Sequence, residues 1–227
     1  MKNMIKDIII AIDGHSGCGK SSTAKELAKH FKYKYLDSGA MYRAVTLFFL
    51  RNKVDINDIK KVRDSLDKIS IDFIVKSGIQ KIFLNGKCVE HLIRKENISK
   101  KVSAISAIPK VRKFLVNIQK KMGLNKKIVV EGRDITTVVF PNAEIKVFMT
   151  ASLDVRARRR YEEMKISNPD ITLDQVSDNL KDRDEKDSSR EDSPLLKVDD
   201  AYYVDTSSLK LDDQIEKIKT LVYEKFG

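Results

Sequence analysis

The stretch GHSGCGKSS, residues 14–22, decides the fold of this chain. Gly14 and Gly19 frame four other residues, and Lys20 and Ser21 follow directly, so the stretch matches the pattern G-x-x-x-x-G-K-S/T. A pattern this short also arises by chance. The sequence on either side must therefore show whether it has a structural meaning.

The flanking residues predict a strand before the stretch and a helix after it. Residues 7–12, DIIIAI, are a short apolar run rich in β-branched side chains, as in a buried parallel strand. After the stretch, apolar residues recur with the spacing of one helix face: Ala24, Leu27, Ala28 and Phe31. A strand, a glycine-rich turn and a helix in this order predict a loop whose N–H groups surround phosphate oxygens.

Each position in this glycine loop then has an expected chemistry. Glycines let the backbone curl so that successive N–H groups point inward, and the helix N-terminus adds partial positive charge. We expect Lys20 to reach the β- and γ-phosphates of a nucleotide, and the Ser21 hydroxyl to ligate Mg²⁺. The expected nucleotide-binding residues are Gly14, His15, Ser16, Gly17, Cys18, Gly19, Lys20, Ser21 and Ser22.

The composition is that of a globular protein in a reducing compartment. Of the 227 residues, 41% are hydrophobic, which is enough for a core, and the longest apolar run is too short to span a membrane. The two cysteines, Cys18 and Cys88, predict free thiols in the cytoplasm. Cys18 is either redox-reactive or, in the interpretation we favour, a small side chain that fills a variable motif position.

The formal net charge of +11 has two interpretations. One is nucleic-acid binding, and the other is a lysine-rich surface with a pocket for a polyanionic substrate. Charges of both signs are spread along the chain, and the sequence carries no helix-turn-helix, zinc-finger or aromatic RNA-binding signature. We therefore expect neither nucleic acid nor a membrane as a partner.

The rest of the chain alternates between predicted helices and strands. Further strands are predicted at residues 33–36, 128–130, 145–149 and 202–204, and helices at residues 41–49, 59–69, 98–105, 111–122, 152–160 and 215–226. This alternation predicts an α/β fold with a doubly wound parallel sheet. Ligands of such sheets bind beyond the carboxyl ends of the strands, where the glycine loop, Asp37–Gly39 and Gly132–Asp134 are expected.

The hydrophobic period changes from 3.6 to 2 at about residues 69–92. Apolar residues alternate with others from Ile69 to Val75, Ser77-Gly78 predicts a turn, and Asn85-Gly86 predicts a tight hairpin. We expect a small antiparallel insert of three strands here, inside the α/β core.

Residues 181–192, KDRDEKDSSRED, contain ten charged residues in twelve. One helical stripe changes from apolar to charged residues without a break in register: Leu173, Val176, Leu180, Arg183, Asp187 and Arg190. The segment is either a solvated helix or a lid whose charged half faces a phosphate site. The spacing leaves both interpretations open.

Together these motifs resemble those of bacterial cytidylate (CMP) kinases, of the P-loop nucleoside monophosphate kinase family. The resemblance covers nearly the whole chain and rests on the inserted strands and on the stretches AIDGHSGCGKSS, YLDSGAMYRAV, PKVRKFL, EGRDITTVVFP and RDEKDSSRED. It implies a monomeric cytoplasmic enzyme that transfers a phosphoryl group from MgATP to CMP or dCMP. It also implies one kinase domain, with a core (about residues 1–68, 93–165 and 195–227), a nucleotide-binding insert (about 69–92) and a lid (about 166–194).

The resemblance implies a role for individual residues on the acceptor side. The residues that would hold the acceptor phosphate are Ser38, Arg43, Arg133 and Arg190. Those that would read cytosine are Ser103, Arg112 and Asp134, while Arg183 and Asp187 would approach the sugar and the transferring phosphate. Because the acceptor is already an anion, catalysis would need positioning and charge neutralisation rather than a base. That catalytic role would fall to Lys20, Arg133, Arg183 and Arg190.

Several of these positions have an alternative interpretation. Ser38 is also a typical helix cap, and Arg43 and Arg112 are also typical of solvent-facing helix surfaces. The arginines of residues 156–160 form what resembles a surface stripe, with approach of one of them to ATP as the alternative. Asp134 either accepts a hydrogen bond from the cytosine amino group or helps to organise magnesium without contacting the base.

The chain also departs from the family's common pattern. Lys20-Ser21-Ser22 stands where Lys-Gly-Thr is frequent, which keeps a hydroxyl for magnesium. Lys186 and Ser188 stand where other members can carry arginines, which bears on how firmly the lid grips phosphate.

Two other classes of function remain as alternatives. Residues 52–55, NKVD, match the guanine-reading motif of GTPases, but they follow a helix about thirty residues after Lys20, without an accompanying D-x-x-G switch. A kinase of UMP or another small molecule shares the glycine loop but fits the insert and residues 132–134 less well.

Overall fold

The computed structural model describes residues 7–76, 79–166 and 168–227, and the chain divides into two compact units. Unit 1 comprises Met1–Leu36 and Met122–Gly227, and unit 2 comprises Asp37–Lys121. Unit 1 carries the glycine loop, and unit 2 carries the antiparallel strands.

Unit 1 is built on a five-stranded sheet with the strand order β2-β6-β1-β7-β8. The strands are β1 (Ile9–Gly14), β2 (Lys34–Asp37), β6 (Ile128–Gly132), β7 (Ile145–Thr150) and β8 (Tyr202–Asp205). The central strand β1 pairs in parallel with both β6 and β7, and β8 pairs in parallel with β7. The predicted parallel sheet is confirmed, and the carboxyl ends of β1 and β6 meet at one edge.

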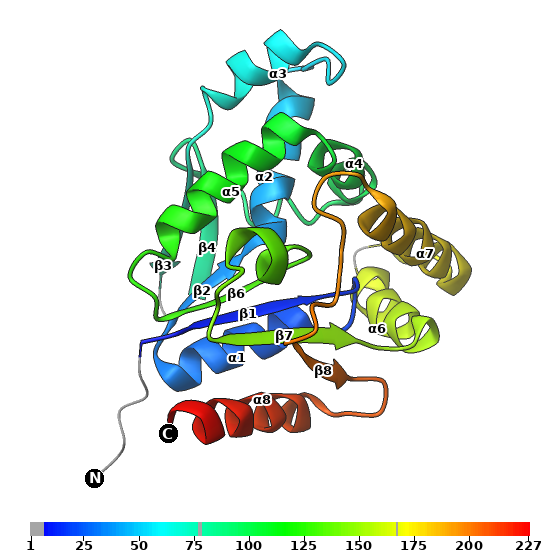
Figure 1. Ribbon diagram of the computed structural model, residues 1–227. Coiled ribbons are helices and arrows are strands. Elements are labelled where there is room, and N and C mark those ends of the chain that lie inside the picture. The colour runs from blue at the N-terminus through cyan, green and yellow to red at the C-terminus, as the bar shows by residue number, and fades with distance from the viewer. Residues whose placement is uncertain (1–6, 77–78, 167) are drawn as a thin grey trace. The chain divides into compact units, whose positions relative to one another are not determined.

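The helices of unit 1 are α1 (Lys20–Phe31), α6 (Leu153–Lys165), α7 (Leu173–Ser189) and α8 (Leu211–Phe226), together with a short π-helix, η1 (Ile135–Val139). Figure 1 shows α1 and α8 side by side along the same face of the sheet. The Thr23 hydroxyl of α1 donates to the Gln214 side chain of α8 (3.1 Å), which joins the two helices directly.

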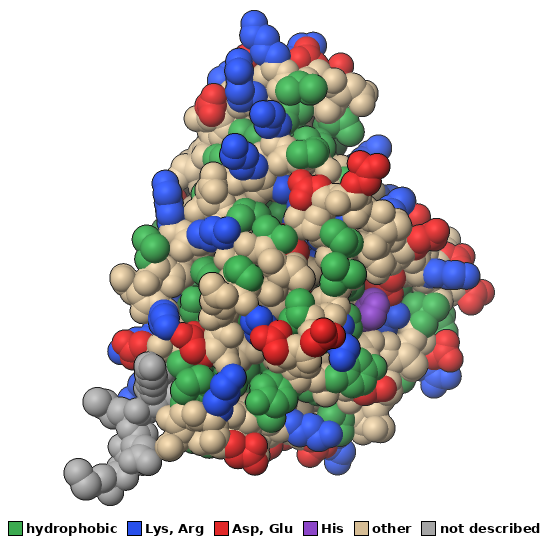
Figure 2. All heavy atoms as spheres, in the orientation of Figure 1, with side chains coloured by type: hydrophobic (Ala, Val, Ile, Leu, Met, Phe, Trp, Pro, Cys, Tyr) green, Lys and Arg blue, Asp and Glu red, His purple; other side chains and the backbone are tan. Residues whose placement is uncertain are grey.

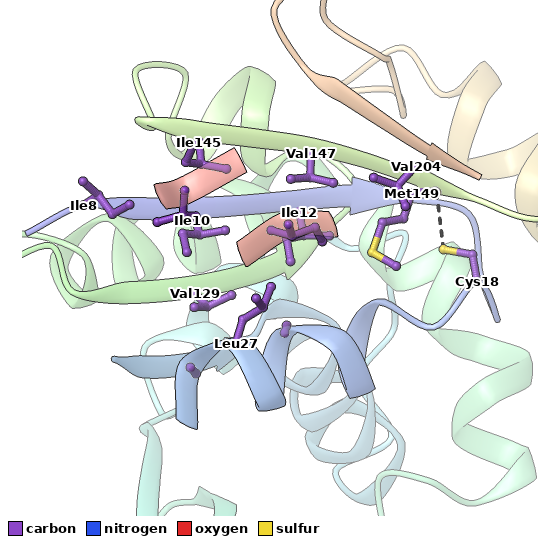
Figure 3. Close-up of a cluster of buried hydrophobic side chains, with 14 of the residues drawn as sticks. Ile8, Ile10, Ile12, Cys18, Leu27, Val129, Ile145, Val147, Met149 and Val204 are labelled. Atoms are coloured by element: carbon purple, nitrogen blue, oxygen red, sulfur yellow. Dashed lines mark hydrogen bonds between the residues drawn. The ribbon is translucent and has the colours of Figure 1, made fainter. Parts of the chain in front are cut away.

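The core of unit 1 explains why β1 is apolar from Ile9 to Ile12. Every residue of β1 is buried, as expected for a strand covered on both faces. Ile10 and Ile12 pack in one cluster with Leu27 of α1 and Val147 of β7 (Figure 3). Burying one such side chain contributes about 1.5–3 kcal/mol, so this cluster firmly anchors the strand that leads into the glycine loop.

Unit 2 combines helices with a separate antiparallel sheet. Its helices are α2 (Ser38–Arg51), α3 (Ile59–Leu66), α4 (Glu96–Ser106) and α5 (Pro109–Met122), and its strands are β3 (Ile71–Lys76), β4 (Ile79–Leu84) and β5 (Lys87–Cys88). The strand order is β3-β4-β5, with both pairs antiparallel, which confirms the predicted three-stranded insert. Asn85 and Gly86 both have positive φ (48° and 74°), as the predicted tight hairpin requires. The turn expected at Ser77-Gly78 lies outside the described residues.

Lysine and arginine side chains are interspersed with aspartate and glutamate side chains on the face shown in Figure 2. Among the described residues, no helix is both long and apolar enough to cross a bilayer.

Candidate active site

The glycine loop connects β1 directly to α1. Gly14 has a φ of 146°, and a Cβ added there would lie 1.8 Å from the Met149 carbonyl oxygen of β7, so only glycine fits this close approach. Gly19, with a φ of 91°, caps α1 without a side-chain hydrogen bond. Backbone N–H groups at this helix N-terminus are therefore available to an anion.

Lys20 is the first residue of α1, and its side chain is buried in the loop that it follows. Its Nζ donates to the His15 carbonyl oxygen (2.5 Å) and lies 3.7 Å from Cys18 Sγ. Burial lowers the pKa of Lys20, and the positive charge of Arg133 acts in the same direction. A buried ammonium group beside another cation is a site that a polyanion would stabilise.

Contacts from outside the loop hold its backbone in place. The Thr206 hydroxyl donates to the Cys18 carbonyl oxygen (3.0 Å), and Cys18 Sγ lies 3.3 Å from the Met149 carbonyl oxygen (Figure 3). Cys18 is fully buried, which favours its interpretation as a small filler rather than a reactive thiol. His15 Nδ1 lies 3.1 Å from the Thr150 hydroxyl, and burial lowers the pKa of His15.

Arg156 of α6 contacts the glycine loop, so the surface-stripe interpretation of residues 156–160 is wrong for this residue. Its side chain is buried, with Nε donating to the Ala151 carbonyl oxygen (2.8 Å) and Nη1 to the Ser16 carbonyl oxygen (3.2 Å). The same Nη1 donates to Asp184 of α7 (2.5 Å). Asp184 in turn accepts a long hydrogen bond from the Ser16 N–H (3.4 Å), so a carboxylate of α7 contacts the glycine loop.

Asp187 of α7 is surrounded by Arg133, Arg183 and Arg190, the three arginines of unit 1 that were predicted to contact the acceptor or the transferring phosphate. Arg133 Nε donates to Asp187 Oδ2 at 2.9 Å. Arg190 Nη1 lies 3.6 Å from Oδ1, and Arg183 Nε lies 3.9 Å from Oδ2. The structure thus brings together in unit 1 a buried carboxylate and three cations that follow β6 or lie on or next to α7.

The charges in this cluster perturb one another. Burial alone would raise the pKa of Asp187, but the charges of Arg133, Arg183 and Arg190 outweigh burial and hold the pKa below its usual value. Burial lowers the pKa of Arg183 to about 10, and the charge of Arg133 acts in the same direction. The charged form of Arg183 is therefore destabilised by burial and by a neighbouring cation, as is common at sites that bind an anionic ligand.

Helix α7 is held by its apolar half. Val176 and Leu180 are buried in a small cluster with Ala157 of α6, and Thr172 and Gln175 form a capping box at the start of the helix. The predicted stripe is confirmed from Val176 onward, whereas Leu173 is exposed because it lies in the first turn, at the helix end. Since Asp187 is buried, a fully solvated charged segment is wrong at this position.

Residues Gly132, Arg133 and Asp134 lead from the carboxyl end of β6 into η1. Asp134 is buried and occupies the N-cap position of η1 without a side-chain cap hydrogen bond. The two N–H groups at the start of η1 are instead bound by Asp13, the residue before the glycine loop. Asp13 is fully buried.

Unit 2 contains the other predicted acceptor residues. Ser38 is buried in the first turn of α2, but the cap of that helix is Asp37, whose side chain accepts from the Ala40 N–H (2.8 Å). Capping is therefore the wrong explanation for Ser38. Asp37 also forms an ion pair with Arg94 (2.8 Å).

Arg43 and Arg112 are both buried, so neither is a solvent-facing helix residue. Arg43 Nη1 donates to the Ser99 hydroxyl (2.9 Å), which ties α2 to α4. Arg112 Nη1 donates to the Ser106 carbonyl oxygen (3.1 Å), and its guanidinium lies 5.6 Å from the centre of the Tyr42 ring. Ser103 is half-buried on α4.

Among the charged residues that contact the loop or η1, no individual role was predicted from the sequence for Asp13, Arg156 or Asp184. An ionisable residue at the end of an unbroken apolar strand was a signal for Asp13, because charges are rarely buried without a partner. Neither Arg156 nor Asp184 differs in local pattern from its charged neighbours, so no local signal marks them.

The residues present fit a bound nucleotide and magnesium. The loop offers N–H groups at a helix N-terminus and a buried Lys20, and the half-buried Ser21 is the next residue of α1. No group of three or more acidic, histidine or cysteine ligands occurs within the described ranges. Mg²⁺ commonly takes few protein ligands and completes its shell with phosphates and water, so a single hydroxyl such as that of Ser21 is a suitable protein ligand for it.

Comparison with known proteins agrees with these features. A family model described as cytidylate kinase matches residues 10–224. The cytidylate kinase of Cytophaga hutchinsonii is 44% identical over 223 residues, covering 97% of this chain and 95% of that protein. The cytidylate kinase of Bacteroides thetaiotaomicron is 45% identical over 228 residues, covering 98% of each chain.

A solved structure supports the fold alone. An uncharacterized protein from Eubacterium ventriosum has a TM-score of 0.54 at 15% identity, covering 96% of this chain and 99% of that chain. The family model spans most of the sequence, and the named relatives are 44–45% identical along nearly their full length. The chain therefore belongs to the cytidylate kinase family.

Proposed function

We propose that this protein transfers the terminal phosphoryl group of MgATP to CMP or dCMP, giving CDP or dCDP. The observation that carries the proposal is the combination, within unit 1, of a glycine loop holding a buried Lys20 with three arginines gathered on Asp187. Phosphoryl transfer needs this concentration of fixed positive charge, because negative charge spreads over the transferring group. Membership of the cytidylate kinase family selects the acceptor.

On the donor side, the loop from Gly14 to Ser22 would hold the ATP phosphates. Lys20 would bind the β- and γ-phosphates, and Ser21 would hold magnesium, which supplies charge neutralisation between the phosphates when bound. The lowered pKa of Lys20 supports this role, because a buried cation gains most from an arriving anion.

On the acceptor side, four residues would hold the phosphate of CMP: Ser38, Arg43, Arg133 and Arg190. The burial of Arg43 supports this role, since a buried guanidinium that is part of the fold is already oriented for a ligand. Cytosine would be read by Ser103, Arg112 and Asp134. For Asp134, recognition of the cytosine amino group and organisation of magnesium remain two alternatives with different predictions.

Helix α7 would act as the lid. In the structure, Asp187 neutralises Arg133, Arg183 and Arg190, and Asp184 contacts the loop through Ser16 and Arg156. A nucleotide phosphate would compete with these two carboxylates for the same cations and N–H groups. Binding of both nucleotides would therefore rearrange residues 181–192 and order them around the substrates.

The remaining expectations form part of the same proposal. The enzyme would act as a cytoplasmic monomer on small nucleotides, with the core, insert and lid divided at about residues 69, 93, 166 and 195. The two free cysteines support a reducing compartment.

The proposal is tested by measuring ADP release with MgATP and a panel of acceptors: CMP, dCMP, UMP, AMP, GMP and shikimate. CMP and dCMP should be the best acceptors, with UMP much weaker. A best acceptor of AMP, GMP or shikimate would contradict the assignment, and preferred binding of GTP over ATP would favour the GTPase alternative. Direct conversion of CMP to CDP, followed by chromatography, excludes ATP hydrolysis as the source of ADP.

A further inference from the structure

Asp13 is a buried carboxylate to which the proposed mechanism assigns no role. It is the fifth residue of β1 and is fully buried. Its oxygens accept three hydrogen bonds: from the Ile135 N–H (3.0 Å), the Thr136 N–H (2.7 Å) and the Thr136 hydroxyl (2.7 Å). All three donors lie at the start of η1, more than a hundred residues away along the chain.

These bonds replace the cap that η1 lacks locally. Asp134, at the N-cap position, makes no side-chain cap hydrogen bond, so the first N–H groups of η1 depend on Asp13. Such groups are costly to bury without an acceptor. Asp13 also pairs in register with Gly132, the last residue of β6, so strand pairing and side-chain bonds bracket the short segment between them.

The bracketed segment is Arg133-Asp134. The Arg133 guanidinium donates back to the Gly132 carbonyl oxygen (3.1 Å) and across to Asp187 (2.9 Å). The next residue after Asp13 is Gly14, where the glycine loop begins. A single carboxylate thus joins the start of the loop that would hold ATP to the segment that carries an arginine for the acceptor.

We propose that Asp13 is a positioning residue for phosphoryl transfer, whose carboxylate fixes the backbone of Arg133 and Asp134 relative to the glycine loop. The inference rests on the proposed function and extends it to a residue that touches neither substrate. Reacting groups must be held closely, because a displacement of about 1 Å can lower a rate about a hundredfold.

The competing explanation is that Asp13 only caps η1 and has no effect on catalysis. The presence of a charged residue at this buried position argues against that explanation. Burial raises the pKa of Asp13 to about 6, so the ionised form is costly, although the three hydrogen bonds partly offset that cost. Among the groups around the carboxylate, Asp134 adds repulsion, while the paired positions on β6 and β7, Gly132 and Phe148, carry no charge. An ionised acceptor forms stronger and more rigid bonds than a neutral cap, which suits positioning better than stability.

The test compares three variants in the full chain: Asp13→Asn, Thr136→Val and Thr136→Ser. Asp13→Asn keeps the shape of the side chain but replaces one carboxylate oxygen with an NH₂ group. That group is itself a donor, so it cannot accept the hydrogen bond that the oxygen accepted. Thr136→Val removes only the hydroxyl donor, and Thr136→Ser retains it as the matched control. We expect Asp13→Asn to lower kcat/KM for CMP by about 10- to 100-fold, while KM for ATP changes by less than about threefold.

The pH profile separates positioning from a general loss of stability. Without the hydroxyl, the Asp13 carboxylate is less stabilised, so Thr136→Val should move the acidic limb of kcat/KM to higher pH than in wild type and Thr136→Ser. The acceptor phosphate itself titrates near pH 6, but it is the same in all samples, so the difference between variants is diagnostic.

Two results would overturn the proposal: a folded Asp13→Asn variant with wild-type kcat/KM for CMP, or superimposable pH profiles for Thr136→Val and Thr136→Ser. If Asp13→Asn does not fold, the Thr136 pair decides. Hydrogen exchange of residues 132–139 is measured in the same samples and should be faster in Asp13→Asn than in wild type. Hydrogen exchange detects the loss of the Asp13 hydrogen bonds even if wild type does not phosphorylate CMP. Inactivity of wild type on CMP would refute the proposed function and not the positioning role of Asp13.

Discussion

The cluster around Asp187 allows a quantitative prediction for one substitution, Asp187→Asn. The asparagine keeps the size of the side chain but removes the charge that neutralises Arg133, Arg183 and Arg190. Removing one partner of a buried ion pair typically costs about 3–5 kcal/mol, because an uncompensated charge remains in a poorly solvated place.

The exposure of the cluster lowers this figure. The Asp187 side chain is 7% exposed, but Arg133 and Arg183 are 16% and 20% exposed, so water and counterions can partly solvate the released cations. We therefore expect a loss of about 2–3 kcal/mol in the stability of α7 against local opening. This corresponds to about 30- to 150-fold faster exchange of the protected α7 amides.

The assay is hydrogen exchange of residues 173–189 at neutral pH without nucleotide. Asp182→Asn is the matched control on the same helix, since Asp182 pairs with Lys186 at the surface (2.7 Å) with both side chains more than half exposed. Such a pair contributes at most about 0.5 kcal/mol, so exchange should rise about twofold or less. Exchange in Asp187→Asn within about threefold of wild type would refute the reasoning that Asp187 holds α7.

The depressed pKa of Asp187 fixes the pH range of this effect. A carboxyl group whose pKa is lower in the folded than in the unfolded state stabilises the fold above its unfolded pKa, near 3.9. That contribution is lost as the pH falls through the folded pKa. The difference between wild type and Asp187→Asn should therefore be full at neutral pH and shrink below about pH 4.

Three other outcomes are expected. Lys20→Ala should lower kcat by about 10²- to 10³-fold with an unchanged fold, as for other groups that stabilise transition-state charge; near-normal turnover would remove the loop from the mechanism. Asp134→Asn should lower the CMP:UMP ratio of kcat/KM by about tenfold if Asp134 reads the base, whereas equal losses for both acceptors with an altered magnesium requirement would support the metal alternative. The pKa of Asp13 is about 6 in the folded state against an ordinary 3.8, so ionisation of Asp13 destabilises the fold. As the pH rises from 4 to 7, the free energy of unfolding of wild type should fall by up to about 3 kcal/mol relative to that of Asp13→Asn. Urea unfolding of both proteins across this range measures the change, and an increase in the stability of wild type relative to Asp13→Asn would contradict the prediction.

Much of the fold could be predicted from local sequence patterns. The β-branched run before the glycine loop, the apolar face of α1 and the Asn85-Gly86 hairpin each depend on residues within a few positions of one another. Backbone conformation and helix or strand periodicity are set at this range, so such features can be predicted from the sequence. Leu173 is an exception: its spacing is that of the buried stripe, but it is the first residue of α7 and its side chain is exposed.

The connections within the site depended on tertiary structure. Asp13 binds Thr136, Arg156 binds Asp184, and neither pair has any spacing that predicts it. Charged residues are common on helix surfaces, so composition could not separate the buried Arg156 from its exposed neighbour Arg158. Which charges are buried, and with which partners, is decided by tertiary packing. The parallel sheet places the end of β1 beside that of β6, which brings Asp13 to Thr136, and the packing of α6 against α7 brings Arg156 to Asp184. Burial then makes those few charges interact strongly, while the many others remain screened by water.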